Sequence, residues 1–301
     1  MKLLIAFVCL TLNLVPVWAN PIAVNIVWGF SPNNSITNYT RHIIHQANLD
    51  QNKYVFNLEV KSGAAGLIAA KQVLADTNNK KVSILMTTDA FFVRPYLFAN
   101  PGYTFDEFDL LYQFAQVPMA LVMKKERKFE DLLQQKSLTL SIIGPGSFTH
   151  VMAQQFSDGH SKDTVLVAYP GPREAVKDVV GGDLDLAFDF VSSVVGDPKL
   201  EIVGITGSQS SSGLKRISDI NKKYYSFNNL NLGVYYLMSR QAPTDTMNEI
   251  KNILLQAQIK SKPLQQSMKN DYATLGETDE KFYQERIKQI ARLTSGMAKV
   301  D

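Results

Sequence analysis

Short apolar runs of β-forming residues alternate with longer stretches of helical period, and this alternation constrains the fold more than any other feature of the 301-residue sequence. The first series has predicted strands at residues 23–28, 54–60 and 82–86, separated by predicted helices that end near residue 47 and span 67–74. Strands and helices that alternate in this way are typical of an α/β protein, in which helices cover a central sheet. The sequence therefore predicts the α/β fold class.

A second series of the same kind begins after Pro118. Its predicted strands lie at residues 119–123, 138–143, 164–168, 184–188 and 201–206, and its predicted helices at 129–135, 147–156 and 171–182. The chain then returns to a predicted strand at 232–238 and ends in predicted helices at 245–259, 262–270 and 280–294. Because the second series repeats the first and the chain is long enough for two modest cores, we expect two α/β domains.

The first nineteen residues have the features of an export signal. Lys2 precedes an apolar run at residues 3–12, and Val17-Trp18-Ala19 offers small residues where a signal peptidase reads, which predicts cleavage after Ala19. The run is short for a membrane span, and no later segment approaches about 18 uninterrupted apolar residues, so the mature protein is expected not to be membrane-embedded. A retained N-terminal anchor is the alternative interpretation.

The single cysteine, Cys9, lies inside this predicted signal. Its removal leaves a mature protein without disulfides or thiols, which excludes thiol catalysis and thiolate metal sites. Lipid attachment at Cys9 is a second alternative, disfavoured because bulky Val8 precedes it and the apolar run before it is short.

Charge and histidine content argue against several other partners. The 31 basic and 28 acidic residues give a formal net charge of +3 without a long basic run, so no nucleic acid is expected as a partner. His42 and His45 are three residues apart on a predicted helix, but no carboxylate or cysteine completes a close set of ligands. We predict neither a metal site nor a cofactor.

Polar loops that contain glycine or small residues follow successive predicted strands. They read GFSPNNSIT, KSGAAG, TTDA, IIGPGSFTH and YPGPREA. In open α/β sheets, ligands bind beyond the carboxyl ends of the strands, where such loops meet helix N-termini. One such loop is most often an ordinary turn, but their recurrence predicts a binding site.

The loop SIIGPGSFTH, residues 141–150, favours anion binding over catalysis. It lacks the lysine of a phosphate-binding loop and the second glycine of a nucleophile elbow. What remains is a helix N-terminus with free amides and the hydroxyls of Ser147 and Thr149, which suits a carboxylate. A plain helix cap at Ser147 is the alternative, and serine catalysis by Ser147 with His150 lacks an orienting acid.

Asp189 stands at the end of a predicted strand, where it could meet a hydrogen-bond donor on a ligand. The aromatic residues Phe30, Phe148, Tyr169 and Phe188 neighbour the predicted loops and could form the walls of a pocket. Aromatic side chains are also common in ordinary cores, so this second expectation depends on the fold.

Two long segments carry a resemblance to a known family. SLTLSIIGPGSFTHVMAQQF followed by YPGPREAVKDVVGGDLDLAFDFVSSV resembles the glycine-serine-histidine loop, the tyrosine-glycine turn and the Phe-Asp segment of the Bug or TctC receptors of tripartite tricarboxylate transporters. Upstream, KSGAAGLIAAKQVLA is similar to the family's Gly-Ala-Gly-Gly helix opening, and GFSPNNSITNYTRHI occupies its first ligand loop. The resemblance covers nearly the whole mature chain.

The resemblance implies a two-lobed periplasmic-binding-protein fold of the Venus flytrap type II, with a ligand cleft between the lobes. It implies a signal peptide at residues 1–19, a first lobe at 20–117 and 231–301, and a second lobe at 118–230. The implied function is a periplasmic receptor, not an enzyme, that captures a small carboxylate for membrane transporter subunits. By position, the implied ligand-binding residues are Phe30, Ser31, Asn33, Asn34, Gly63, Ala64, Ala65, Thr88, Ser147, Thr149 and Asp189.

The sequence also departs from the family's pattern. The family's small first loop is replaced by Ser31-Pro32-Asn33-Asn34, and the second glycine of Gly-Ala-Gly-Gly is Ala65. The resemblance therefore does not specify which carboxylate binds. Two other functions stay open at this stage, a receptor fold used in sensing or ligand presentation and a secreted hydrolase that uses Ser147.

Overall fold

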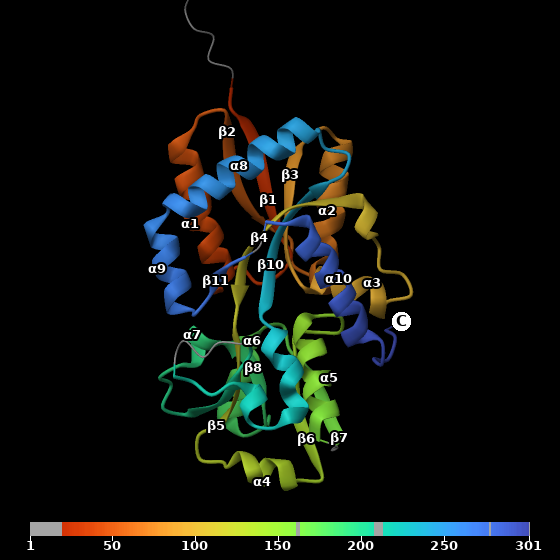
Figure 1. The fold of residues 1–301 in the computed structure, drawn as a ribbon, viewed down its shortest axis with the longest axis vertical. Helices are drawn as coiled ribbons and strands as arrows, with labels where there is room; N and C mark the ends of the chain where they lie inside the picture. The colour runs from red at the N-terminus through yellow and green to blue at the C-terminus, as the bar shows by residue number, and fades with distance from the viewer. Residues whose placement is uncertain (1–19, 161–162, 208–212, 277, 301) are drawn as a thin grey trace, which may run out of the picture.

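A computed structural model describes residues 20–160, 163–207, 213–276 and 278–300. The predicted signal peptide and its cleavage site lie outside these residues. The described chain forms an upper and a lower body in Figure 1, with two strands descending between them. Among the described helices, none is both long and apolar enough to cross a membrane.

The upper body is built on a six-stranded mixed sheet. Its strands are β1 (Ile22–Trp28), β2 (Tyr54–Val60), β3 (Val82–Thr88), β4 (Phe108–Val117), β10 (Leu232–Ser239) and β11 (Thr274–Leu275), in the order β11-β4-β10-β3-β1-β2. β1 pairs in parallel with β2 and β3, whereas β10 runs antiparallel to β3 and β4. The loops after β1, β2 and β3 therefore leave the sheet at the same edge, toward the lower body (Figure 1).

Helices cover this sheet in two groups. α1 (Ser35–Asp50) packs with α8 (Thr244–Lys260) and α9 (Lys262–Asn270). α3 (Ala90–Leu97) packs with α10 (Glu280–Thr294). The 3-10 turn η1 (Ala64–Gly66) leads into α2 (Leu67–Asn78) and also contacts α3. Buried aromatic side chains, Tyr39, Phe56, Phe92 and Tyr236 among them, fill the layers between helices and sheet.

The lower body has a smaller sheet. β5 (Met119–Lys124) pairs antiparallel with β8 (Ala187–Phe190) and β9 (Leu200–Ile205), and β6 (Ser137–Ile142) pairs in parallel with β7 (Asp163–Ala168). A bridge between Leu140 and Leu186 joins the two groups of strands. The helices of this body are α4 (Phe129–Gln134), α5 (Phe148–His160), α6 (Pro172–Gly181) and α7 (Val191–Val194).

The chain crosses between the bodies twice. On the outward crossing, Pro118 alone separates β4 from β5. On the return, Leu230 and Asn231 connect the 3-10 helix η4 (Lys222–Asn229) to β10. Thr206 holds the crossings together, because its Oγ1 accepts the Met119 N–H at 2.9 Å and donates to the Asn231 side chain at 3.1 Å.

The sequence-based prediction lacks the short elements α7 and β11 and two longer ones, α3 and β4. Helix α3 contains Pro95, which argues against a helix interior, and β4 reads FDLLYQFAQV without strict alternation. Consecutive residues from Leu111 to Ala115 in β4 are buried, so both faces of this strand are covered and it needs no exposed polar face. The predicted strand at 184–188 was placed early, because β8 begins at Ala187.

A buried ion pair joins the end of β3 to helix α10. Arg286 Nε donates to Asp89 Oδ1 at 2.7 Å, and the carboxylate also accepts the Gly233 N–H at 2.6 Å and the Tyr235 hydroxyl at 2.8 Å. Burial opposes the charge on Arg286, but the neighbouring Asp89 carboxylate outweighs it and raises the pKa of the guanidinium. The Asp89 carboxylate thus accepts three hydrogen bonds, which helps to stabilise a buried charge.

Arg286 also reaches the return crossing and the lower body. Its two terminal nitrogens donate to the carbonyl oxygens of Asn229 and Asn231, each at 3.1 Å. Its guanidinium carbon lies 5.3 Å from the centre of the Phe148 ring, at the start of α5. One side chain therefore connects the upper sheet, the crossing and the helix that begins at the gap between the bodies.

We expect Arg286→Ala to lower the free energy of unfolding by about 3–5 kcal/mol, because it leaves the buried Asp89 carboxylate without a cation. Urea denaturation measures this loss. Arg240→Ala is the control, since Arg240 pairs with Asp109 on the exposed surface and should cost no more than about 1 kcal/mol. Similar losses in the two variants would contradict the role given to the buried pair.

Candidate functional site

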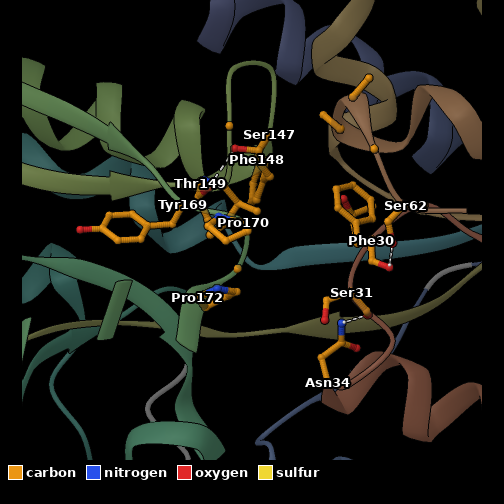
Figure 2. A pocket seen from close by; sticks show the side chains of 18 of the residues that line it. Phe30, Ser31, Asn34, Ser62, Ser147, Phe148, Thr149, Tyr169, Pro170 and Pro172 are labelled. Carbon is orange, nitrogen blue, oxygen red and sulfur yellow. Dashed lines mark hydrogen bonds between the residues drawn. The ribbon is translucent and has the colours of Figure 1, made fainter. Parts of the chain in front are cut away.

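A cavity of about 460 Å³ lies between the two bodies and is lined by both. Figure 2 shows residues of the loops after β1 and β2 on one side and of the loops after β6 and β7 on the other. Nine of the eleven residues expected from the sequence line it: Phe30, Ser31, Asn34, Gly63, Ala64, Ala65, Thr88, Ser147 and Thr149. Asn33 and Asp189 are not among the lining residues.

The first loop is held by a helix cap at the start of α1. Asn34 Oδ1 accepts the Thr37 N–H at 3.0 Å, and Thr37 Oγ1 accepts the Asn34 N–H at 3.3 Å, which completes a capping box. The indole N–H of Trp28 and the side-chain amide of Asn34 both donate to the carbonyl of Ser31 at 2.9 Å. Asn33 is exposed and does not line the cavity. The cap holds its neighbours Asn34 and Ser31 at the cavity.

The second loop has an unusual backbone. Four consecutive residues have positive φ: Gly63 at 137°, Ala64 at 47°, Ala65 at 51° and Gly66 at 92°. Alanine is disfavoured by about 1–2 kcal/mol in the left-handed region, so two alanines here store strain. Arg94 stabilises the turn, since its Nη1 donates to the Ala64 carbonyl at 3.0 Å. The sequence pattern located this loop but did not reveal its strain.

Thr88 ends β3 beside this loop. Its Oγ1 accepts the Ala90 N–H at 3.3 Å, so its own hydroxyl proton stays available toward the cavity. The next residue along the chain is Asp89 of the buried ion pair. The wall of the cavity is therefore attached directly to the pair that stabilises the return crossing.

In the third loop, residues 144–149, two hydroxyls share hydrogen bonds in a way that leaves one proton free. Thr149 Oγ1 accepts the Ile143 N–H at 2.8 Å, and Ser147 Oγ accepts the His150 N–H at 3.2 Å. The two oxygens are 2.9 Å apart and are joined by one O–H···O bond. Two hydroxyls carry two protons and this bond uses one, so one proton remains as a donor at the cavity.

The N-terminus of α5 adds main-chain donors at the same place. Within the described residues, the N–H groups of Phe148 and Thr149 have no protein acceptor, as is usual in the first turn of a helix. The helix dipole makes this end favourable for an anion. Gly146, with φ of 77°, lets the loop pack closely against the Phe98 ring, because a Cβ at this position would lie 2.5 Å from Phe98 Cε2. The loop can bind a carboxylate without a basic side chain.

His150 is not arranged as a catalytic base for Ser147. Its Nδ1 accepts the Gly146 N–H at 3.2 Å, so that lone pair is already used inside the loop. Burial lowers the pKa of His150, which favours the neutral ring. The ring therefore supports the loop's shape.

Asp189 lies behind the cavity wall in β8, paired with Ala120 of β5. Its neighbour Phe190 lines the cavity, and Asp189 Oδ1 accepts the Phe190 N–H at 2.7 Å. Burial raises the pKa of Asp189 to about 7, against the opposing effects of that hydrogen bond and of nearby Arg173. Asp189 thus holds the wall residue Phe190 from within the protein, whereas its position at a predicted strand end had suggested direct contact with a ligand.

Several residues that line the cavity were not among those expected from the sequence. Phe30, Phe148 and Tyr169 line the cavity as expected, whereas Phe188 is fully buried in the core. The additional apolar wall residues include Trp28, Phe98, Met119, Pro170, Pro172, Phe190, Leu232 and Val300. Phe98 and Val300 are more than 200 positions apart and form a parallel bridge, a pairing for which the local sequence pattern holds no signal.

Comparisons with known proteins agree with this architecture. A family model described as the tripartite tricarboxylate transporter family receptor matches residues 44–297. The structure of the periplasmic binding protein BugD has a TM-score of 0.80 at 20% identity, and the match covers 92% of this chain and 99% of BugD. No match was found among curated protein sequences.

Two further solved structures contain ligands. The R. palustris protein Rpa4515 with adipate has a TM-score of 0.75 at 17% identity, covering 93% of this chain and 98% of that protein. MatC (Rpa3494) from Rhodopseudomonas palustris with bound malate has a TM-score of 0.74 at 15% identity, covering 91% and 98%. These similarities confirm the predicted α/β periplasmic-binding-protein fold.

We expect Ala65→Gly to leave stability unchanged or raise it by about 1 kcal/mol, because glycine adopts the positive φ of residue 65 without steric cost. Ala75→Gly is the matched control in the exposed face of α2, where the same change should cost about 1 kcal/mol. Urea denaturation of both variants measures the difference. Equal losses in the two variants would contradict the strained conformation.

We expect Asp189→Asn to change how stability depends on pH. With a pKa of about 7 in the fold and an ordinary value near 4 when unfolded, Asp189 makes the native state bind more protons between those values, so parent stability falls as pH rises. Asparagine does not ionise, so the variant lacks this decline. A pKa difference of one corresponds to about 1.4 kcal/mol, and the variant should gain at least that much relative to the parent across this window.

Urea denaturation at about pH 4.5 and about pH 7.5 tests this expectation, since the two values bracket the titration. If the stability difference between parent and Asp189→Asn is the same at both values, the carboxyl is not protonated by burial.

Proposed function

This chain belongs to the tripartite tricarboxylate transporter receptor family, and we propose that it captures a small carboxylate in the cavity between its two bodies. The observation that carries the proposal is the α5 N-terminus, which lines the cavity and offers two main-chain N–H groups and one hydroxyl proton without an acceptor among the described residues. Donors of this kind suit an anion that must be held and later released. The adipate and malate in two solved structures of the same fold support this ligand class.

The proposal includes the division of the chain into lobes. We assign residues 20–117 and 231–301 to one lobe and 118–230 to the other, with the ligand between them. The crossings at Pro118 and at Leu230–Asn231 support these limits, because each sheet lies wholly on one side of them. Closure of the lobes would bring Phe30, Ser31, Asn34, Gly63, Ala64, Ala65 and Thr88 toward Ser147 and Thr149 as the ligand-binding set.

We also propose that the protein works in the periplasm after cleavage behind Ala19, and that it presents its ligand to membrane transporter subunits. The family's description as a transporter receptor supports these points. Capture is proposed to occur without turnover of the ligand. The use of the His150 Nδ1 lone pair by the Gly146 N–H argues against a hydrolase that activates Ser147.

A thermal-shift screen of the mature protein tests ligand capture. The panel contains monocarboxylates and dicarboxylates, with the corresponding primary amides as uncharged controls. A ligand at 100 times its dissociation constant stabilises the native state by about 2.7 kcal/mol, which gives a clear rise in melting temperature. We expect at least one carboxylate, and none of the amides, to produce this rise. Flat melts across all the acids would reject the proposal.

We expect the double change Ser147→Ala and Thr149→Val to weaken binding of the best carboxylate by about 10-fold or more, because it removes both hydroxyls and with them the free proton, and a hydrogen bond to a charged group is worth about 1.5–3 kcal/mol. Isothermal titration calorimetry measures the change. Ser193→Ala is the control, since Ser193 is exposed on α7 and does not line the cavity. Unchanged affinity in the variant that lacks both hydroxyls would place the carboxylate elsewhere.

A further inference from the structure

Arg94 is a buried arginine without an anionic partner in the described chain. It and Arg286 are the two arginines that are buried among the described residues, at 6% and 7% exposure. Arg286 pairs with the Asp89 carboxylate, whereas the printed partners of Arg94 are main-chain carbonyl oxygens alone. A buried charge is costly unless an opposite charge compensates it. The described protein therefore leaves the charge of Arg94 uncompensated.

The guanidinium of Arg94 is fixed in position by part of its hydrogen-bonding capacity. Nε donates to the Pro101 carbonyl oxygen at 2.7 Å, and Nη1 donates to the Ala64 carbonyl oxygen at 3.0 Å. A guanidinium has five N–H groups, so three of them, including both on Nη2, have no acceptor within the described residues. The two bonds orient the group and leave most of its donors unused.

These unused donors belong to a residue that lines the cavity. Among the described lining residues, Arg94 is the one charged side chain. Its Nη2 atom is not enclosed by protein atoms, so a ligand or water can reach it. Burial lowers the pKa of the Arg94 guanidinium, which is the effect expected where no carboxylate compensates the charge. The opposite shift at Arg286 follows from its pairing with Asp89.

Phe98 holds Arg94 close to the loop that begins α5. The guanidinium carbon lies 4.1 Å from the centre of the Phe98 ring, and Gly146 packs so closely against the same ring that a Cβ there would lie 2.5 Å from Cε2. Helix α3, which carries Arg94, also contacts α5. A cation of the upper body and the helix N-terminus of the lower body therefore border the same cavity.

The α5 N-terminus can meet one carboxylate nearly in full. Its two main-chain N–H groups and one hydroxyl proton would occupy three of the roughly four acceptor positions of a carboxylate. The free N–H groups of Arg94 then need an acceptor of their own once a ligand displaces water. A second anionic group would accept from them and would compensate the buried charge.

We propose that Arg94 is a specificity-determining residue that binds a second anionic group of the solute, while the first carboxylate binds at the α5 N-terminus. The inference rests on the proposed function and deepens it, because it assigns the recognition of ligand charge to one side chain of the upper wall. A dianionic solute thus contacts both bodies through its charged groups.

Succinate, glutarate and adipate, each compared with its own monoamide, test the inference by isothermal titration calorimetry on the mature protein. A monoamide has nearly the shape of its diacid but lacks the second charge. At about pH 7.5 both carboxyl groups of a diacid are ionised. We expect at least one diacid to bind about 10-fold or more tightly than its monoamide, because charge-assisted hydrogen bonds are roughly twice as strong as neutral ones.

Variants of Arg94 show whether this side chain is the source of the preference. In Arg94→Gln, which removes the cation, the advantage of the diacid over its monoamide should fall by about 10-fold or more. Arg94→Lys keeps a positive charge and should retain more of that advantage than Arg94→Gln. Arg240→Gln is the control, since this exposed arginine does not line the cavity and its loss should leave the advantage within about 2-fold of the parent.

Arg94 also holds the Ala64 turn, so a structural role must be told apart from ligand binding. A change in the turn alone would weaken the diacid and its monoamide by the same factor, whereas loss of the proposed contact weakens the diacid more. Melting temperatures without ligand report whether each variant is folded.

The outcomes separate this inference from the proposed function. If every monoamide binds as tightly as its diacid, or if Arg94→Gln weakens both by the same factor, carboxylate capture stands and Arg94 does not bind a second anionic group. The inference also fails if another acid of the thermal-shift panel binds and none of these three diacids does. If no acid binds, both the inference and the proposed function are rejected.

Discussion

The buried pair of Asp89 and Arg286 is the interaction on which the arrangement of the two bodies depends. The carboxylate fixes the start of β10 through Gly233 and Tyr235, and the guanidinium fixes the return crossing through two carbonyl oxygens. Charges so deeply buried are tolerated because each has several partners with good geometry. Since Thr88 and Phe148 flank this pair and line the cavity, its geometry also sets the positions of both walls.

In the proposed function, neutral donors at the α5 N-terminus bind the charge of the ligand. A basic side chain would hold a carboxylate strongly, but helix amides and a hydroxyl offer donors whose strength depends on closure and on exclusion of water. The strained backbone of Ala64 and Ala65 lies on the opposite wall of the cavity. Arg94, which also lines the cavity, holds that loop through the Ala64 carbonyl oxygen.

Much of this was accessible from the sequence, for identifiable reasons. The loops after β1, β2 and β6 contain small and polar residues, and eight of the eleven expected residues line the cavity from these loops, with Thr88 at the end of β3 as the ninth. Asn33 differs because the cap formed by Asn34 turns it outward, and Asp189 because the pleat of β8 directs it into the protein. Phe98, Val300 and Arg286 could not be placed, since their partners are distant in sequence and are brought together by tertiary packing alone.

The outward crossing at Pro118 limits where this protein chain can accept insertions and deletions. Pro118 is the single residue between strands that belong to different sheets, and both strands have fixed partners on either side. One inserted residue there would either break the pairing of Met119 with Phe190 or turn every side chain of β5 to the opposite face. In related proteins, insertions and deletions should therefore occur in surface turns and not at the position of Pro118.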